Sequence, residues 1–300
     1  MQQPGLDYQI ENDNFKNLAR ALTRVENDLP GSQEILRNLN TKSNSIVLGI
    51  TGPPGAGKST LVNGMISQLS AEDKRVAVLA IDPTSPFNLG SLLGDRIRMT
   101  EQFNKPNVYI RSLATRGSLG GLSAKTIEMV DVLKSAGFDY ILVETVGVGQ
   151  SEVEIVGLAD VTIVVLVPES GDEIQSIKSG LMEIADIFVV NKADREGADT
   201  FANNLKKLAH QKATHVPVIK TIADRSEGII ELLNAVKEHT LSENKQRVFL
   251  LAEKAWSLIQ RKRMNDIDKK KLRQDIAEAS KKADFNLYLF VEEFMGSNLS

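Results

Sequence analysis

Seven short runs of aliphatic and β-branched residues recur through the middle of the chain, each followed by polar or glycine-containing residues. They are Ile46–Ile50, Val76–Ile81, Val108–Ile110, Tyr140–Glu144, Val161–Val167, Ile187–Val190 and Val216–Ile219. Most of these runs are continuously apolar, which is typical of strands that are covered on both faces. Five stretches with apolar residues at helical spacing predict the covering helices. These stretches are Thr60–Leu69, Ser123–Ala136, Gly171–Glu183, Thr200–Gln211 and Ile229–Glu238.

This alternation of strands and helices predicts the α/β class, with a mostly parallel, doubly wound sheet that binds ligands at the carboxyl ends of its strands. Before the first strand, two short helical patterns are separated by Pro30-Gly31, and a polar stretch, NTKSN, follows them. We therefore expect a helical N-terminal extension over residues 1–44 and the α/β domain over residues 45–240.

The pattern changes after Leu241, where amphipathic and highly charged helical stretches form an arm over residues 241–300. The arm ends in an apolar cluster that includes Leu287, Leu289 and Phe290. Such a cluster needs either its own small domain or a second subunit to bury it.

Composition and charge narrow the possible partners. The 300 residues contain 36 Lys and Arg against 39 Asp and Glu, a net charge of −3 that gives no overall attraction to nucleic acid or to anionic lipid. The chain has no cysteine and three scattered histidines, which excludes disulfides and thiolate metal sites. It also lacks a secretory leader pattern and any run of about 18 apolar residues. We expect a cytoplasmic protein without nucleic-acid or membrane partners.

The first strand run is followed by a phosphate-loop motif, Gly52-Pro53-Pro54-Gly55-Ala56-Gly57-Lys58-Ser59, and then by a helix that includes Thr60. The glycines can turn successive N–H groups toward one concave space, which suits a polyphosphate. Lys58 adds a full charge at the helix N-terminus, and the Ser59 hydroxyl is placed to bind magnesium. The alternative, a chance glycine turn, is disfavoured because strand and helix both flank the motif.

Acidic residues follow two other strand runs and one loop. Asp82 and Glu144 each end a strand, while Asp95 lies in a loop rich in Gly, Arg and Ser. Two carboxylates and a hydroxyl form the oxygen-rich set that Mg²⁺ prefers, so Ser59, Asp82 and Glu144 are the predicted metal residues. A solvated loop carboxylate is the alternative for each acid, and for Asp95 both interpretations stay open.

A second motif, Asn191-Lys192-Ala193-Asp194, ends the sixth strand run. The Asp194 carboxylate can accept hydrogen bonds from the ring N–H and the exocyclic amine of guanine, and the Lys192 stem can lie over the base. Adenine lacks both donors on that edge and would leave the carboxylate unpaired. After a buried strand in a phosphate-loop protein, this motif predicts guanine selectivity.

Taken together and in order, six segments closely resemble the MeaB/ArgK family of GTPases, which is associated with methylmalonyl-CoA mutase and related cobalamin-dependent acyl-CoA mutases. The segments are GPPGAGKST, AIDPTS, LGDRIRM, ILVETVGVGQSE, GDEIQSIKSGLMEIAD and NKAD. The resemblance implies a homodimer that binds GTP, gates delivery of adenosylcobalamin to its mutase and helps replace damaged cofactor. It also implies that residues 241–300 are a dimerisation arm, whose apolar cluster is buried by the second subunit.

The family pattern also implies roles for single residues. It assigns Gly52–Thr60 to the phosphates, Ser59, Asp82 and Glu144 to magnesium, and Asp95 and Gly147 to the two switch loops. Catalysis then rests on Lys58, Asp82, Asp95, Glu144 and Gly147, and base binding on Asn191, Lys192 and Asp194. Residues 171–178 are an additional switch in the family, although the start of an amphipathic helix explains them equally well.

Two departures from common GTPase patterns change the expected activity. The residue after Gly147 is Val148 rather than a glutamine that orients the attacking water, which predicts slow intrinsic hydrolysis. Ile222 stands where a serine is common before Ala223, whose backbone N–H can still serve the guanine carbonyl. The segment Val108–Gly121 runs from a strand into a Gly- and Ser-rich loop and contains Arg111 and Arg116, whose roles stay open.

The resulting hypothesis is a magnesium-dependent GTPase that converts GTP to GDP and phosphate in order to switch a protein partner, a cobalamin-dependent acyl-CoA mutase. Three alternatives are a GTPase metallochaperone, a transport-associated ATPase or kinase, and a nucleotide binder without turnover. The lack of Cys and of a His cluster opposes the first alternative, and Asp194 opposes the second. Phosphate release tests the third.

Overall fold

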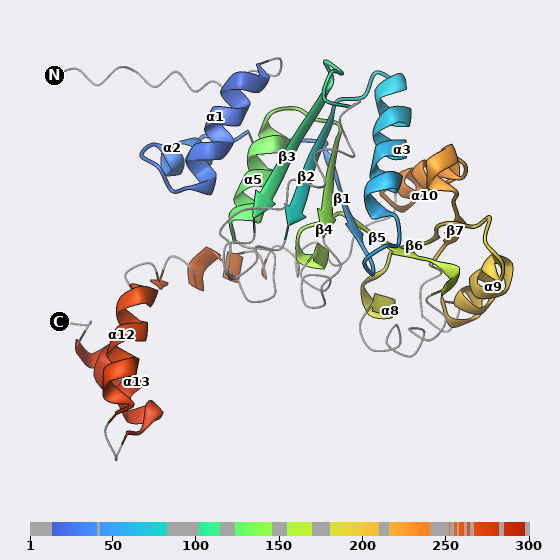
Figure 1. Cartoon of the computed structure of the whole chain (residues 1–300). Helices are drawn as coiled ribbons and strands as arrows, with labels where there is room; N and C mark the ends of the chain where they lie inside the picture. Colours follow the sequence, from blue (N-terminus) through green and yellow to red (C-terminus); the bar gives the residue numbers. More distant parts are fainter. Residues whose placement is uncertain are drawn as a thin grey trace. The chain divides into compact units, whose positions relative to one another are not determined.

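Seven described strands form one parallel sheet in the computed structural model (Figure 1). The strands are β1 (Ile46–Thr51), β2 (Val76–Asp82), β3 (Val108–Ala114), β4 (Tyr140–Thr145), β5 (Val161–Leu166), β6 (Ile187–Val190) and β7 (Val218–Lys220). Their order across the sheet is β3-β2-β4-β1-β5-β6-β7, and each pairing is parallel. The predicted fold class is confirmed, and each predicted run overlaps one of these strands.

The structure describes most of the α/β region and parts of the arm. The described residues are 14–40, 43–82, 102–114, 124–145, 155–169, 181–209 and 216–240, followed by 252, 255–256, 258–260, 263–264, 267–281 and 285–297. Within some elements, including the end of β2, the backbone is described without the side chain. None of the helices in these ranges is long and apolar enough to cross a membrane.

Helices connect the strands and cover both faces of the sheet. Those of the α/β region are α3 (Lys58–Ala71), α5 (Ala124–Ser135), α8 (Leu181–Ile184), α9 (Ala198–Ala209) and α10 (Ile229–Thr240). Four of the five predicted helices lie within two residues of their predicted bounds. The fifth, over residues 171–183, falls largely outside the described residues, and α8 overlaps its end.

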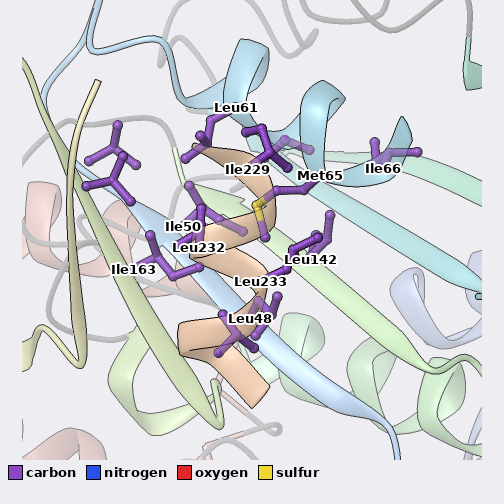
Figure 2. Packing of buried hydrophobic residues seen from close by; sticks show 14 of the residues in the cluster. Leu48, Ile50, Leu61, Met65, Ile66, Leu142, Ile163, Ile229, Leu232 and Leu233 are labelled. Atoms are coloured by element: carbon purple, nitrogen blue, oxygen red, sulfur yellow. The ribbon is translucent and has the colours of Figure 1, made fainter. Parts of the chain in front are cut away.

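One face of the sheet is buried under α3 and α10. Figure 2 shows the side chains that fill this layer, with Leu61 and Met65 from α3, Leu232 from α10, and Leu48 and Ile50 from β1. All five side chains are fully buried. Since each such side chain contributes about 1.5–3 kcal/mol on burial, this layer holds the helix that follows the phosphate loop firmly in place.

The opposite face is covered by α5, by α9 and by the N-terminal helices α1 (Phe15–Glu26) and α2 (Ser32–Arg37). Leu18, Leu22 and Val25 of α1 are buried against the sheet and α5, as expected from their helical spacing. Residues 1–254 form one compact unit. The boundary at residue 44 therefore stays a prediction, although the helices before it share the core of this unit.

An ion pair fixes α1 to the edge strand β3. The Arg111 side chain on β3 pairs with Glu26 at 2.5 Å and donates hydrogen bonds to the Ala19 carbonyl at 3.3 Å and to the Thr23 hydroxyl at 3.1 Å. Both charged side chains are largely buried, with 17% and 15% exposure. Arg111, whose role the sequence leaves open, therefore anchors the N-terminal helix.

The register of the strands determines which residues meet at the carboxyl edge. Ile50 of β1 pairs with Glu144 of β4, and Thr51 pairs with Val164 of β5. The chain leaves β1 at this point to form the phosphate loop, so Glu144 emerges directly beside it. β6 lies one strand beyond β5, which brings the segment after Val190 to the same edge.

Residues 255–300 form a second compact unit that contains α12 (Lys269–Ala279) and α13 (Leu287–Ser297). Within it, Phe290 stacks on Phe294 with ring centroids 6.0 Å apart. On the same helix Leu287, Tyr288 and Leu289 are exposed, Tyr288 to 80%. The unit thus presents apolar surface that its own described residues leave uncovered.

Candidate nucleotide site

The phosphate loop passes close over β5, and two glycines make that path possible. Gly52 has φ 138°, and a Cβ atom there would lie 2.1 Å from the Val165 carbonyl oxygen. Gly57 has φ 86°, and its Cβ would lie 2.4 Å from Nδ2 of Asn191. Both positions therefore require glycine for backbone conformation and for space.

Lys58, the first residue of α3, folds back onto the phosphate loop. Its Nζ donates to the carbonyl oxygens of Gly52 at 2.8 Å and Pro53 at 2.9 Å, and the residue is only 8% exposed. A buried ammonium needs such partners, because desolvation of a lone charge is costly. The amine is thus held at the mouth of the loop, next to the N-terminus of a 14-residue helix that favours anions.

The Ser59 hydroxyl donates a hydrogen bond of 2.6 Å to Oε1 of Glu144. Glu144 is 6% exposed at the end of β4, whereas Ser59 lies in the first turn of α3. The structure therefore brings together two of the three predicted metal residues. The third, Asp82, ends β2, and the description of that residue stops at its backbone.

Asn191 joins the phosphate loop to the segment that follows β6. Its amide nitrogen donates to the Ala56 carbonyl at 2.9 Å, and its Oδ1 accepts from the Thr221 hydroxyl at 3.0 Å and from the Ala223 N–H at 3.2 Å. At 2% exposure, Asn191 is among the most buried polar residues of the site. One side chain thus fixes three loops relative to one another.

Two of these contacts go beyond the sequence prediction. The Ala223 N–H, which we expected to serve the guanine carbonyl, donates to Asn191, and its role toward the base stays a prediction. Thr221 supplies a buried hydroxyl one position before Ile222. Its place after a strand that pairs with β6 is the sequence signal that could have identified it.

Lys192 also reaches the phosphate loop. Its Nζ donates to the Gly55 carbonyl at 2.7 Å, so the aliphatic stem spans the space between the two motifs. Its backbone has φ 56°, an uncommon conformation for a residue with a side chain. Strain of this kind is characteristic of functional sites whose surroundings hold the backbone in place.

Asp194 lies at the open end of this assembly. Its side chain is 39% exposed, and Oδ2 faces a guanidinium nitrogen of Arg225 at 3.7 Å. The carboxylate is therefore accessible to an incoming base. Arg225 ends the short 3-10 helix η4 (Ala223–Arg225).

Several predicted residues fall outside the part of the chain that the structure describes. They are Asp95, Gly147 and the segment 171–178, together with Val148 and Arg116. The described site residues nevertheless converge on one edge of the sheet. Pro53 is partly exposed, and Pro54, Gly55 and Thr60 are exposed at this edge.

A central parallel strand, a glycine-rich loop, a helix N-terminus with a buried lysine and an adjoining Asn-Lys-Ala-Asp segment define a P-loop protein of the GTPase class. Residues 18–278 match the family model described as methylmalonyl Co-A mutase-associated GTPase MeaB. The chain belongs to this family, and the resemblance seen in the sequence is confirmed. It is a GTPase.

Relatives with known names support the assignment. A putative GTPase of Pyrococcus abyssi is 53% identical over 229 residues, which are 74% of this chain and 71% of that one. The mouse protein named methylmalonic aciduria type A homolog, mitochondrial, is 39% identical over 74% of this chain and 55% of its own length. Escherichia coli GTPase ArgK is 39% identical over 66% of this chain and 61% of its own.

Solved structures agree with the fold. The crystal structure of a LAO/AO transport system kinase aligns over 100% of both chains with a TM-score of 0.65 at 23% sequence identity. The hydrogenase maturation factor HypB from Archaeoglobus fulgidus aligns over 74% of this chain and 99% of its own with a TM-score of 0.52 at 18% identity. At these identities the two structures show a shared architecture alone.

Proposed function

We propose that this GTPase uses magnesium to hydrolyse GTP and that its nucleotide cycle gates cofactor loading and protection of a cobalamin-dependent acyl-CoA mutase such as methylmalonyl-CoA mutase. One observation carries the nucleotide part of the proposal. Asn191 and Lys192 both bond to carbonyls of the phosphate loop, so a guanine-selective motif and a polyphosphate site form a single site. The family model and the mouse relative support the mutase part.

Hydrolysis joins a water oxygen to the γ-phosphorus and breaks the bond from that phosphorus to the β–γ bridging oxygen. GDP, inorganic phosphate and a proton are released. The protein's contribution is positioning and neutralisation of charge, because little covalent chemistry is required of it. Lys58 exchanges the carbonyls of Gly52 and Pro53 for phosphate oxygens, and the loop N–H groups bind the remaining charge.

The described residues fit a magnesium ion. Ser59 and Glu144 offer oxygen donors 2.6 Å apart at the edge of the phosphate loop, and Mg²⁺ prefers oxygen ligands while retaining several waters. In this proposal Ser59 holds the ion directly, whereas Glu144 and Asp82 hold it or its waters. When bound, magnesium supplies positive charge to the β- and γ-phosphates.

The test is steady-state phosphate release by the full chain, with and without a purified cobalamin-dependent acyl-CoA mutase. Because Val148 follows Gly147, we expect slow turnover alone and a ten- to hundredfold increase with mutase, which is about 1.4–2.8 kcal/mol of barrier. Lys58→Ala is the matched control, since it corrects for contaminating phosphatase. An unchanged rate at saturating mutase, with binding confirmed separately, would contradict the mutase part.

We also propose a homodimer in which α13 is covered by the second subunit. Leu287, Leu289 and Val291 are about half exposed on this helix, an apolar surface that monomers rarely present. Leu289→Asp should shift sedimentation from dimer to monomer, whereas Glu292→Gln on the same helix should not. A dimer that persists in Leu289→Asp would contradict this arrangement.

The sequence opposes the metallochaperone alternative, because it contains no cysteine and no cluster of histidines. The similarities to HypB and to the transport system kinase concern the fold, and neither carries an activity over to this chain.

A further inference from the structure

We infer that Arg225 is a positioning residue for the guanine-binding carboxylate and thereby contributes to base selectivity. The inference rests on the proposed guanine site and deepens it. It begins from the ion pair between Arg225 and Asp194, which lie on two different loops and approach to 3.7 Å at the open end of the site.

The turn that carries Arg225 is rigid. Ile222 and Glu227 exchange backbone hydrogen bonds of 3.1 and 3.2 Å, and the Arg225 N–H donates to the Ile222 carbonyl at 2.9 Å. Gly228 closes the turn at φ 78°, where a Cβ atom would lie 2.2 Å from the Lys220 carbonyl oxygen. The guanidinium therefore extends from a backbone with little freedom.

The same turn is locked to the loop that carries Asp194. The Asn191 side chain accepts from the Ala223 N–H, and the Ala193 N–H donates to the Thr221 carbonyl at 3.0 Å. Both bonds join the same two loops as the ion pair, within three residues of Asp194 and four of Arg225. The backbones that carry Arg225 and Asp194 are thus held together, since neither loop can move away from the other without breaking these bonds.

The chemistry of the pair fits a positioning role. At 3.7 Å the guanidinium attracts the carboxylate without forming a hydrogen bond, so the acceptor sites of Asp194 stay available to a ligand. Guanine offers two N–H donors to such a carboxylate and needs both oxygens oriented together. The Arg225 side chain is 59% exposed, and its positive charge on one side of Asp194 favours one orientation of the carboxylate. The Ile222 side chain, in the same turn, has no polar atom that could orient the Asp194 carboxylate.

A comparison of GDP with IDP tests this role. Hypoxanthine, the base of IDP, retains the ring N–H of guanine but lacks the exocyclic amine, so it makes one bond to the carboxylate instead of two. A poorly oriented Asp194 harms the two-bond ligand more. In the full chain, Arg225→Ala should therefore weaken GDP binding by about two- to fivefold, as expected for an exposed ion pair, and IDP binding by less.

Two matched variants separate positioning from general effects. Arg225→Lys preserves the charge and should retain most of the GDP preference, because the pair is electrostatic and not a bidentate hydrogen bond. Lys220→Ala removes a positive charge from the same edge, where Lys220 pairs with Asp199, and should leave the GDP-to-IDP ratio unchanged. The difference in GDP affinity between wild type and Arg225→Ala should also shrink in 1 M salt. The Debye length is then about 3 Å, shorter than the 3.7 Å between the two charged groups.

The measurement is the dissociation constant of each nucleotide by calorimetry, with the unfolding midpoint of every variant as a folding check. An unchanged GDP-to-IDP ratio in Arg225→Ala, or tighter GDP binding, would overturn the inference while leaving the guanine site intact. Equal binding of GDP and ADP by the wild type would instead overturn the guanine site itself, and this inference with it.

Discussion

The two ends of the nucleotide site are built differently. At the phosphate end, Lys58 is buried and held by two carbonyls, and Gly52 and Gly57 leave no room for a side chain. At the base end, Asp194 is 39% exposed and faces a single guanidinium at 3.7 Å. Asn191 connects the two ends through buried hydrogen bonds. From this difference we propose that the phosphate end supplies affinity and rate, whereas the base end supplies selectivity.

The sharpest test of this division is Lys58→Ala. Loss of a charged donor from a water-poor site should lower the rate of phosphate release by about 10²–10³-fold. Binding of GTP and binding of ITP should weaken equally, because Lys58 contacts phosphate and not the base. Calorimetric binding of both nucleotides checks this. A variant that loses GTP binding but retains ITP binding would refute the division.

The complementary change is Asp194→Asn at the base end. The amide retains an acceptor for the ring N–H but turns a donor toward the exocyclic amine, so GTP binding should fall by about ten- to hundredfold. Xanthine carries a carbonyl at that position and should now bind better than guanine. Competition between GTP and XTP for the variant measures the exchange. If the preference for guanine persisted, Asp194 would not read the base.

Sequence reasoning predicted the fold well, and it placed the two motifs after strands of the sheet, because both features are encoded locally. Continuous apolar runs identify strands covered on both faces, and glycine spacing identifies the phosphate loop. The strand order also places Glu144 beside the loop that precedes Ser59, as expected for this one of the two strand-end acids.

The contacts between motifs were not predictable in the same way. The assignment of Asn191 to the base stays a prediction, whereas its bonds to Ala56 and Ala223 depend on the spacing of β1, β6 and β7 in three dimensions. The partner of Arg111 lies 85 residues earlier, on α1, where no local pattern indicates it. Long-range packing, and not propensity, determines such pairs.

The link between the two ends can be weakened by Gly57→Ala. Its methyl group would meet Nδ2 of Asn191 and displace the hydrogen bond to Ala56, in addition to the strain of a left-handed alanine. Gly55→Ala is the matched control, because φ is 78° there and a Cβ meets nothing within 4 Å. The free energy of unfolding of Gly57→Ala should be about 0.5–1.5 kcal/mol lower than that of Gly55→Ala. Equal free energies of unfolding in urea would show that the Asn191 side chain moves aside without loss of stability.

The smallest effect is expected at the exposed rim of the base end. There Arg195, the residue after Asp194, pairs with Glu169, which follows β5. The hydrogen bond from Arg195 holds the pKa of Glu169 below its ordinary value of 4.5. A depressed carboxyl pKa contributes stability above the ordinary value, and this contribution is lost as the pH falls through the folded pKa. Both side chains are about half exposed, so solvent screening limits the contribution to a few tenths of a kcal/mol.

Glu169→Gln should therefore reduce the free energy of unfolding slightly at pH 7 and not at all at a pH below the folded pKa. Denaturation curves at several pH values, compared with those of the exposed neighbour variant Glu196→Gln, measure the difference. A loss above about 1 kcal/mol at neutral pH, beyond the range of an exposed pair, would mean that the Arg195–Glu169 pair stabilises the base end more than its exposure implies. The contacts at the base end would then stabilise the protein as strongly as those at the phosphate end. This would run contrary to the difference in burial between Asp194 and Lys58.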